Sequence, residues 1–253
     1  MKKPRVAAYA GTRNLYKLMM TAAKSLLLHS NVDHIYFLIE DDKFPYKIPN
    51  YIEPINVSRQ TYFRQDGPCM NSKWTWMVLM RAIYYDLFPD LDEILSLDAD
   101  TFVEEDISDL WDLEMTTPEG YEYYFAGSLE PAKTTDKFLY INFGVNFQNL
   151  KALRNGKGCE IKDIINTRNF SCPEQDVVNR RCQKHILCIP SSYNACDWTE
   201  PTDEKKIIHY AAIPQKDWIN NPIVEKYRNM SWRDLPRRER KVKPRNWNKQ
   251  FLM

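Results

Sequence analysis

The sequence predicts an α/β fold, and three observations support this prediction. Short apolar runs alternate with an amphipathic segment in the first third of the chain, in the order strand, helix, strand. A further short apolar run over residues 93–97 ends in two aspartates. The 253 residues, 43% apolar and 27% charged, are enough for one large α/β domain or for a domain with small additions.

The first strand, helix and strand are expected over residues 6–10, 14–30 and 34–39. The helix carries an apolar stripe at a spacing of three and four residues. Gly11 and Thr12 occupy the turn between the first strand and this helix, a common nucleotide contact in such sheets. The chain has neither the dinucleotide-binding glycine fingerprint nor a P-loop motif, so neither signature explains this turn.

Alternating elements continue through the middle of the chain. A helix expected over residues 71–88 places Lys73 and Arg81 roughly on one side, because they are eight residues apart. Each could bind phosphate or be solvated, and solvation is the usual state of a lone surface cation. Further strands are expected at 52–57, 122–128 and 139–148, a short helix at 106–113, and a polar loop over the site at 130–137.

Asp98 and Asp100 follow the buried strand of residues 93–97. Residues i and i+2 share one face of a strand, so both carboxylates leave its carboxyl end on the same side, where open α/β sheets bind ligands. Two carboxylates this close repel each other unless a cation joins them, and oxygen ligands suit Mg²⁺ or Mn²⁺. The alternative is a solvated acidic turn after a core strand.

Two positions in later strands have both a functional and a structural interpretation. Gly144 lies inside the strand pattern of residues 139–148, where glycine indicates a β-bulge or the close approach of another group. The neighbouring Asn142 is either a ligand contact or a buried structural amide. His209 ends a strand expected over residues 207–210, and a single histidine there is more often scaffolding than a ligand.

A helix is predicted to begin at Ser171. Ser171 and Glu174 have the spacing of a capping box, and Pro173 fits the first turn. The capping box gives a structural reason for Glu174, but it gives none for Gln175 or Asp176.

Net charge, apolar runs and cysteine spacing argue against several classes of protein. The formal net charge of +1 does not indicate nucleic-acid binding, and no apolar window approaches the roughly 18 residues of a transmembrane helix. The apolar run near the start is too short for a signal peptide. The six cysteines form no C-x-x-C pair, which favours free thiols in a reducing cytoplasm over disulfides or zinc. The expected location is therefore cytoplasmic.

The C-terminal segment changes composition. From residue 231 onward, basic residues are interleaved with aromatic ones, which suits peripheral contact with an anionic membrane surface. A solvated or self-packed tail explains the composition equally well, and nucleic acid is less expected because no recognised motif is present. The basic residues are Arg233, Arg237, Arg238, Arg240, Lys241, Lys243, Arg245 and Lys249, and the aromatic ones are Trp232, Trp247 and Phe251.

Five motifs follow one another along the chain: Leu95-Ser-Leu-Asp-Ala-Asp-Thr-Phe-Val103, Asp106-Ile-Ser-Asp-Leu-Trp111, Tyr140-Ile-Asn-Phe-Gly-Val145, Glu174-Gln-Asp-Val-Val-Asn179 and Ile208-His-Tyr210. Together they resemble glycosyltransferase family 8, which includes glycogenin and the bacterial lipopolysaccharide galactosyl- and glucosyltransferases. The resemblance implies a GT-A fold over residues 1–225, with a Rossmann-like nucleotide-binding mixed sheet flanked by helices and small acceptor-side additions, followed by the segment 226–253.

The resemblance also implies an activity and a site. The activity is retaining transfer of a hexosyl group, glucose or galactose, from a UDP-sugar to a glycan, lipid-linked or protein acceptor with Mn²⁺ or Mg²⁺. The implied metal ligands are Asp98, Asp100 and His209; the nucleotide contacts are Ala10, Gly11, Thr12, Asn14, Arg81, Ala99 and Lys216; the donor-sugar contacts are Asn142, Glu174 and Gln175; and the catalytic residues are Gln175 and Asp176.

The chain departs from the family pattern at several of these positions. Thr12 stands where an acidic residue often binds uracil, and Glu174 replaces a more usual aspartate. Relatives read His-x-x-Gly-x-x-Lys-Pro-Trp after the metal histidine. Here the glycine is lost and the lysine, Lys216, is displaced by one place.

The implied mechanism is front-face attack. Gln175 matches the position below the anomeric carbon and is a poor nucleophile, so the acceptor is expected to attack from the face that UDP leaves, with a β-phosphate oxygen as base. Closure of loops around 130–137 and 210–218 would exclude water. Two alternatives remain. One is a haloacid-dehalogenase-like phosphatase, whose Asp-x-Asp-x-Thr signature residues 98–101 fit only superficially. The other is a non-catalytic sugar-nucleotide- or glycan-binding relative.

Overall fold

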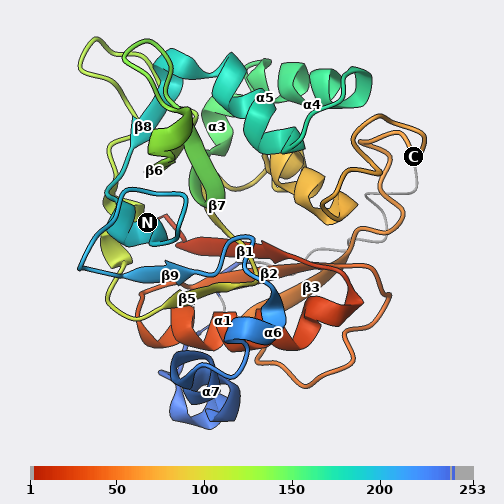
Figure 1. The fold of residues 1–253 in the computed structure, drawn as a ribbon. Coiled ribbons are helices and arrows are strands. Elements are labelled where there is room, and N and C mark those ends of the chain that lie inside the picture. The colour runs from red at the N-terminus through yellow and green to blue at the C-terminus, as the bar shows by residue number, and fades with distance from the viewer. Residues whose placement is uncertain (1–2, 240, 243–253) are drawn as a thin grey trace.

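The computed structural model describes residues 3–239 and 241–242 (Figure 1). Its main strands are β1 (Val6–Ala10), β2 (His34–Ile39), β3 (Ile52–Asn56), β4 (Glu93–Leu97), β6 (Phe125–Leu129), β7 (Ile141–Asn149) and β8 (Ile186–Cys188). Within the described residues they form one seven-stranded sheet in the order β3-β2-β1-β4-β7-β6-β8. The first four strands are parallel, β7 is antiparallel to β4 and β6, and β8 is parallel to β6. The predicted mixed sheet is therefore confirmed.

Helices cover both faces of this sheet (Figure 1). On one face lie α1 (Tyr16–Leu28), α6 (Gln215–Trp218) and α7 (Pro222–Asn229); on the other lie α2 (Tyr84–Leu87), α3 (Leu150–Leu153), α4 (Lys157–Thr167) and α5 (Pro173–Arg181). Because side chains alternate along a strand, β1 contributes to both cores. Ala7 and Tyr9 pack with α1 and α7, whereas Val6 and Ala8 pack with the opposite layer.

A second, two-stranded sheet positions the site. β5 (Thr101–Val103) pairs antiparallel with β9 (Ile207–His209), and the register sets Thr101 opposite His209. The turn after β4 leads straight into β5, so this pairing brings His209 beside the two aspartates although more than a hundred residues separate them in the sequence.

The predicted helix over residues 71–88 is shorter than expected. Residues 71–75 form turns, and the helix begins with a 3₁₀ segment, Trp76–Ile83, that continues into α2. The Ser72 hydroxyl accepts a hydrogen bond from the Trp74 N–H at 3.3 Å, a local bond that competes with the helical pattern. The predicted helix over 106–113 is likewise a 3₁₀ segment, Ser108–Asp112, and the short helices of residues 13–15, 131–133, 183–185, 191–194 and 232–234 are also 3₁₀.

The described part of the C-terminal segment packs against the domain. Tyr227 of α7 is fully buried, and the Trp232 indole N–H donates to the Lys47 carbonyl at 3.2 Å. Arg238 donates to the carbonyl of Leu27 at 2.8 Å. The boundary expected between residues 225 and 226 therefore falls inside α7, and the self-packed interpretation holds as far as the described residues extend. Arg240 and residues 243–253, with Trp247 and Phe251, lie outside them.

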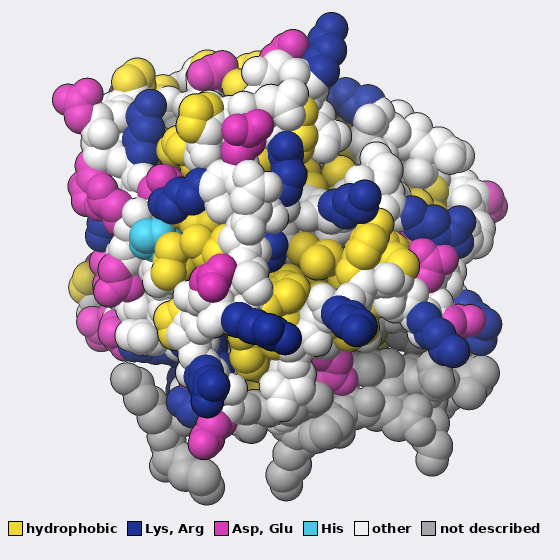
Figure 2. Space-filling view, turned by 90° about the horizontal axis from the view of Figure 1, so that it is seen from below, with side chains coloured by type: hydrophobic (Ala, Val, Ile, Leu, Met, Phe, Trp, Pro, Cys, Tyr) yellow, Lys and Arg dark blue, Asp and Glu magenta, His cyan; other side chains and the backbone are white. Residues whose placement is uncertain are grey.

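The face beneath α1 and α7 carries charges of both signs. Figure 2 shows lysine and arginine side chains there beside apolar ones, with aspartate and glutamate among them. Across the described residues, no helix is long and apolar enough to cross a membrane. The six cysteines are all free.

Candidate active site

Asp98 and Asp100 lie in the tight connection between β4 and β5. The Asp98 N–H donates to the Gly144 carbonyl of β7 at 2.8 Å, and the Asp98 carbonyl accepts from the Thr101 hydroxyl at 2.7 Å. These bonds fix the turn, so both carboxylates are held at the carboxyl end of β4. Their side chains remain 35% and 28% exposed, respectively, which leaves them open to a ligand.

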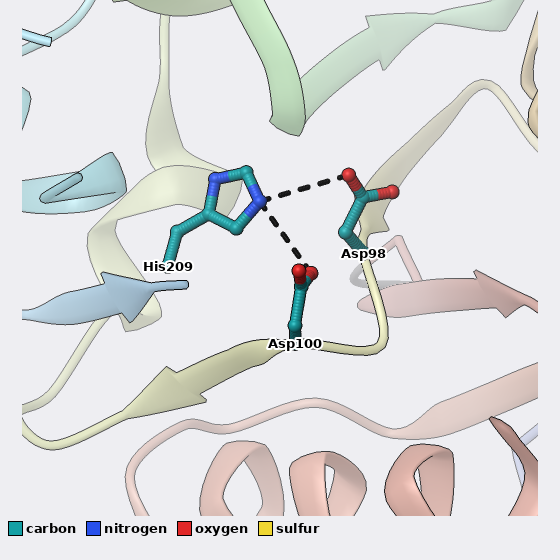
Figure 3. A group of neighbouring side chains, drawn as sticks. All are labelled: Asp98, Asp100 and His209. Atoms are coloured by element: carbon teal, nitrogen blue, oxygen red, sulfur yellow. Dashed lines mark ion pairs between the residues drawn. The ribbon is translucent and has the colours of Figure 1, made fainter. Parts of the chain in front are cut away.

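His209 completes this acidic cluster (Figure 3). Its Nε2 lies 3.7 Å from Asp98 Oδ2 and 3.5 Å from Asp100 Oδ1. One ligand atom from each residue lies within 4.8 Å of the others, which fits a single divalent ion. Carboxylate oxygens suit Mn²⁺ and Mg²⁺, and the partial exposure leaves coordination positions for a substrate. Asp98, Asp100 and His209, predicted as a metal site, are therefore brought together.

A buried amide sets the orientation of the His209 ring. Asn194, which is fully buried, accepts at Oδ1 from His209 Nδ1 over 2.8 Å and donates from Nδ2 to Asn142 Oδ1 at 3.0 Å. Because the Asn194 oxygen faces the ring, Nδ1 carries a proton in either charge state of the imidazole, and in the neutral form Nε2 would present its lone pair to a bound ion. Such an outer hydrogen bond is how proteins usually fix a ligating histidine.

The residues of this acidic cluster shift one another's pKa values. Burial opposes a positive charge on His209, but the Asp100 carboxylate outweighs it and, with Asp98, raises the pKa of His209 to about 10. Burial likewise opposes ionisation of Asp100, yet the imidazole holds the pKa of Asp100 below its usual value. Without a metal ion, a proton on His209 therefore supplies the positive charge that the two carboxylates require.

Gly144 lies beside Cε1 of the His209 ring. A Cβ at this position would be 2.0 Å from His209 Cε1 and 2.7 Å from each ring nitrogen. The sequence prediction of close approach at this glycine is confirmed, and the approaching group is the candidate metal ligand itself.

We therefore expect Gly144→Ala to displace the His209 ring. The overlap should lower the free energy of unfolding by about 1–3 kcal/mol, a typical cost of overpacking. It should also weaken Mn²⁺ binding, measured by calorimetry. In a His209→Ala background the added methyl has space, so Gly144→Ala should then cost little stability. An equal cost in both backgrounds would contradict the steric explanation.

Arg81 and Glu174 form a buried ion pair, which excludes the solvated alternative for Arg81 and corrects the capping-box prediction for Glu174, while the predicted contact of Arg81 with the nucleotide stays a prediction. Arg81 is 6% exposed rather than solvated, and its guanidinium bonds to Glu174 and, at 2.6 Å, to Asp98 Oδ1. Glu174 is 2% exposed and does not cap its helix, since the N-cap of α5 is Cys172 and lacks a side-chain cap bond. The predicted capping box is wrong because Arg81 competes successfully for the Glu174 carboxylate.

Gln175 and Asn142 belong to one buried polar network centred on Glu130. Glu130 Oε1 accepts from Asn142 Nδ2 at 2.8 Å and from Gln175 Nε2 at 3.0 Å. Gln175 Oε1 accepts from the Phe143 N–H at 2.9 Å. The same Asn142 bonds to Asn194, so the network links Gln175 to the histidine of the metal cluster.

Asp176 joins the edge of this network through Tyr140, whose hydroxyl accepts from Gln175 Nε2 at 3.2 Å. Its carboxylate accepts from the Tyr140 hydroxyl at 2.5 Å and from the Cys172 N–H at 3.0 Å. The second of these bonds fixes the start of α5. The structure therefore gives Asp176 a positioning role at the helix terminus, and its predicted catalytic role stays a prediction.

One pocket is lined by both the acidic cluster of Asp98, Asp100 and His209 and the polar network around Glu130. It is lined by many of the predicted site residues: Arg81, Asp98, Asp100, Asn142, Glu174, Gln175 and His209. The first turn lies beside it, because the β1–β4 register pairs Tyr9 with Leu97 and so sets Ala10 level with Asp98. Ala10, Gly11, Thr12, Asn14 and Ala99 do not line the pocket, and Lys216 is exposed on α6.

Several lining residues had no specific sequence signal. Glu130 and Lys133 stand in the predicted polar loop, but nothing marked them as part of a network. Trp74 and Trp198 also line the pocket. Asn194 is a single amide at the end of the 3₁₀ helix of residues 191–194, and its contact with His209 is what indicates its importance.

Ala212, at the edge of the pocket, adopts a left-handed conformation with φ of 59°. This is the position at which the resemblance expects glycine. We expect Ala212→Gly to relieve about 1 kcal/mol of backbone strain, partly offset by greater freedom of the unfolded chain. Thermal unfolding should show a small stabilisation, whereas Ala211→Gly, where φ is not left-handed, should be destabilising.

Comparison with known proteins places this site in a family. A family model described as glycosyl transferase family 8 matches residues 6–221. The chain belongs to this family. Membership of family 8 makes the protein a transferase and leaves the dehalogenase-like phosphatase without support. The lipopolysaccharide 1,2-glucosyltransferase of Escherichia coli (strain K12) is a family relative at 28% identity over 254 residues, covering 84% of this chain and 73% of that protein.

Solved structures show that the family 8 chain has a GT-A fold. GlyE of Streptococcus pneumoniae TIGR4 superposes with a TM-score of 0.66 at 20% identity, covering 92% of this chain. The galactosyltransferase LgtC, solved with donor and acceptor sugar analogs, gives 0.65 at 17% identity and covers 97% of this chain and 99% of its own. The bifunctional WbbM gives 0.68 at 12% identity. The chain spans 62% of the GlyE chain and 51% of the WbbM chain.

Proposed function

We propose that this family 8 protein is a metal-dependent, retaining hexosyltransferase that uses a UDP-sugar donor. The observation that carries the proposal is the convergence of Asp98, Asp100 and His209 at the carboxyl end of β4. Two carboxylates and a correctly oriented imidazole form a donor set for Mn²⁺ or Mg²⁺. When bound, the ion would stabilise negative charge on the leaving diphosphate, a contribution of several kcal/mol.

The chain's own residues supply the rest of the donor site. The turn of Ala10, Gly11, Thr12 and Asn14 lies beside Asp98 and is proposed to hold the nucleoside. Among the described residues, the buried Oε2 of Glu174 has no hydrogen-bond partner, and the Glu174 side chain lines the pocket. A buried carboxylate oxygen is costly to leave unpaired, so we assign it to a hydroxyl of the donor sugar. Asn142 and Gln175 lie on the same wall.

Gln175 supports transfer with retention. Both hydrogens of its amide nitrogen are engaged, by Glu130 at 3.0 Å and by the Tyr140 hydroxyl at 3.2 Å. Within the part of the chain that the structure describes, its carbonyl oxygen accepts a single bond, from the Phe143 N–H, and so retains one lone pair. An amide oxygen is a weak nucleophile but can stabilise positive charge at an anomeric carbon. This favours front-face attack by the acceptor, with a donor phosphate oxygen taking the proton.

Lys216 needs a movement to contribute. It is exposed on α6, and the segment before it is held by stacking of Tyr210 on Trp218, with ring centroids 4.6 Å apart. We propose that the 210–218 segment moves as a unit when the donor binds, together with the 130–137 loop.

Release of UDP from UDP-glucose and UDP-galactose tests the proposed function. We expect release with Mn²⁺ and a loss of release when the ion is chelated with EDTA. Product anomers should be of the same configuration as the donor. Hydrolysis of simple phosphomonoesters without UDP release would overturn the proposal, and UDP binding without any turnover would identify a non-catalytic relative.

A further inference from the structure

Two tryptophans are exposed at the same pocket. Among the residues that the structure describes, four large hydrophobic side chains are exposed: Tyr46, Trp74, Tyr121 and Trp198. Trp74, at 36%, and Trp198, at 46%, both line the pocket that contains the metal cluster. Exposed apolar surface that gathers at a cavity is typical of a ligand-binding site rather than of random surface variation.

Both indoles are held in place by their ring nitrogens. Trp74 Nε1 donates to the Ser171 carbonyl, ahead of α5, at 3.1 Å, and Trp198 Nε1 donates to the Ala211 carbonyl, after β9, at 3.4 Å. Each ring is therefore tied to a second segment of the chain, and the Trp198 ring would follow the 210–218 segment when that segment moves on donor binding. Rings tied in this way contribute apolar contact area at low cost in conformational entropy.

The Trp198 segment is also anchored to the catalytic framework. Thr199, next in the chain, is 4% exposed and donates to the Asn194 carbonyl at 2.7 Å. Asn194 is the residue that orients His209. The position of the Trp198 ring is thus linked to the position of the metal cluster through a short, buried connection.

Polar groups lie on the same wall as the indoles. Glu130 and Lys133 line the pocket, and their side chains pair at 2.7 Å. Lys73 also lines it, with its Nζ 4.9 Å from the centroid of the Trp74 ring. Aromatic faces with adjacent charged hydrogen-bonding groups match a sugar ring, which has an apolar face of C–H groups and an edge of hydroxyls. The nucleoside does not explain the indoles, because the turn of residues 10–14 does not line this pocket.

We propose that Trp74 and Trp198 form the acceptor-binding subsite and that they stack on a sugar ring of a glycan acceptor. The inference rests on the proposed glycosyltransferase function and adds the chemical class of the acceptor: a glycan that presents a ring face, not a protein side chain or an isolated alkyl chain. The acceptor hydroxyl would then approach from the Trp74 and Trp198 side of the pocket.

Binding to an oligosaccharide array tests the subsite. Full-length protein with Mn²⁺ and UDP is applied to immobilised neutral and phosphorylated oligosaccharides, and Kd is then measured for the glycan bound most strongly. We expect Trp74→Ala and Trp198→Ala each to weaken glycan binding by about tenfold or more, as is usual for tryptophans that a bound ligand covers. Trp198→Phe should recover part of the loss, because it keeps an aromatic face.

Tyr121→Ala is the matched control, because Tyr121 is an exposed aromatic residue, at 64%, that does not line the pocket. This variant should bind the glycan as the wild type does. Affinity for UDP is measured on every variant. A loss of UDP affinity equal to the loss of glycan affinity would overturn the inference, because the indoles would then contact the nucleotide. Unchanged glycan binding in both tryptophan variants, or no glycan binding by wild-type protein that binds UDP, would also overturn it. Wild-type protein that neither binds UDP nor releases it from UDP-sugars would instead reject the proposed function.

Discussion

Replacing Arg81 with methionine is expected to lower the free energy of unfolding by about 3–5 kcal/mol, the usual cost of breaking a buried ion pair from one side. Arg81 pairs with Glu174 and Asp98 and donates to the Phe143 carbonyl at 2.9 Å. Methionine fills a similar volume but leaves the Glu174 carboxylate buried without a cation. Chemical denaturation with urea measures the change.

The double variant Arg81→Met with Glu174→Gln distinguishes the loss of stability caused by an unpaired charge from the loss caused by altered packing. Removing both charges leaves no unpaired buried ion, so the double variant should be more stable than Arg81→Met alone. Additive losses from the two single changes would contradict the ion-pair explanation, since coupled neighbours do not behave additively.

The cost of Arg81→Met should also depend on pH. Burial raises the pKa of Glu174 even in the wild type, and the loss of the guanidinium should raise it further. A carboxyl group whose pKa is higher in the folded than in the unfolded state takes up a proton on folding. Its destabilising effect is therefore complete at pH values above the folded-state pKa and absent at pH values below the unfolded-state pKa. The loss of stability should therefore shrink as the pH falls from about 7 to about 5. An equal loss at both pH values would show that packing, not charge, is responsible.

The Arg81–Glu174 pair shows why the sequence predicts secondary-structure elements more reliably than it predicts the partners of buried side chains. The strands around the site were predicted because their apolar runs and turns are local properties. The sequence predicts a capping box at Glu174 for the same reason, because its spacing from Ser171 is a local property. Its real partner lies ninety-three residues away in sequence, and the low dielectric of the interior makes that charge pair stronger than a cap at a helix terminus.

The candidate metal site could be predicted only in part for a similar reason. Period-two geometry places Asp98 and Asp100 on one side of their turn, whereas His209 joins them through the β5–β9 pairing, which no local pattern reveals. The ordered motifs of the family resemblance supplied that residue. They did not supply Asn194, Glu130 or the two pocket tryptophans, because the roles of these residues come from contacts made only in the folded chain.

Asp100→Asn is expected to reduce metal-dependent UDP release by about a thousandfold, if the lost ligand removes several kcal/mol of charge stabilisation. Asparagine keeps the shape of the side chain but removes the charge that faces His209 Nε2 at 3.5 Å. The fold should persist, because Asp100 is 28% exposed and the β4–β5 turn is fixed by backbone bonds of Asp98. Initial rates of UDP release at saturating UDP-sugar, with circular dichroism on the same samples, measure both effects.

The reference sample for Asp100→Asn is wild-type protein from which the metal has been removed with EDTA. If Asp100 acts through the ion, the two should have similar residual rates, and added Mn²⁺ should restore only the wild type. Asp163→Asn serves as the matched control, since that aspartate is 72% exposed on α4 and does not line the pocket, and its rate should be that of the wild type. An Asp100→Asn rate that remains undiminished would remove the acidic cluster from the reaction. If Asp100→Asn has a low rate and EDTA lowers that rate by the same factor as it lowers the wild-type rate, the metal ion would instead bind elsewhere.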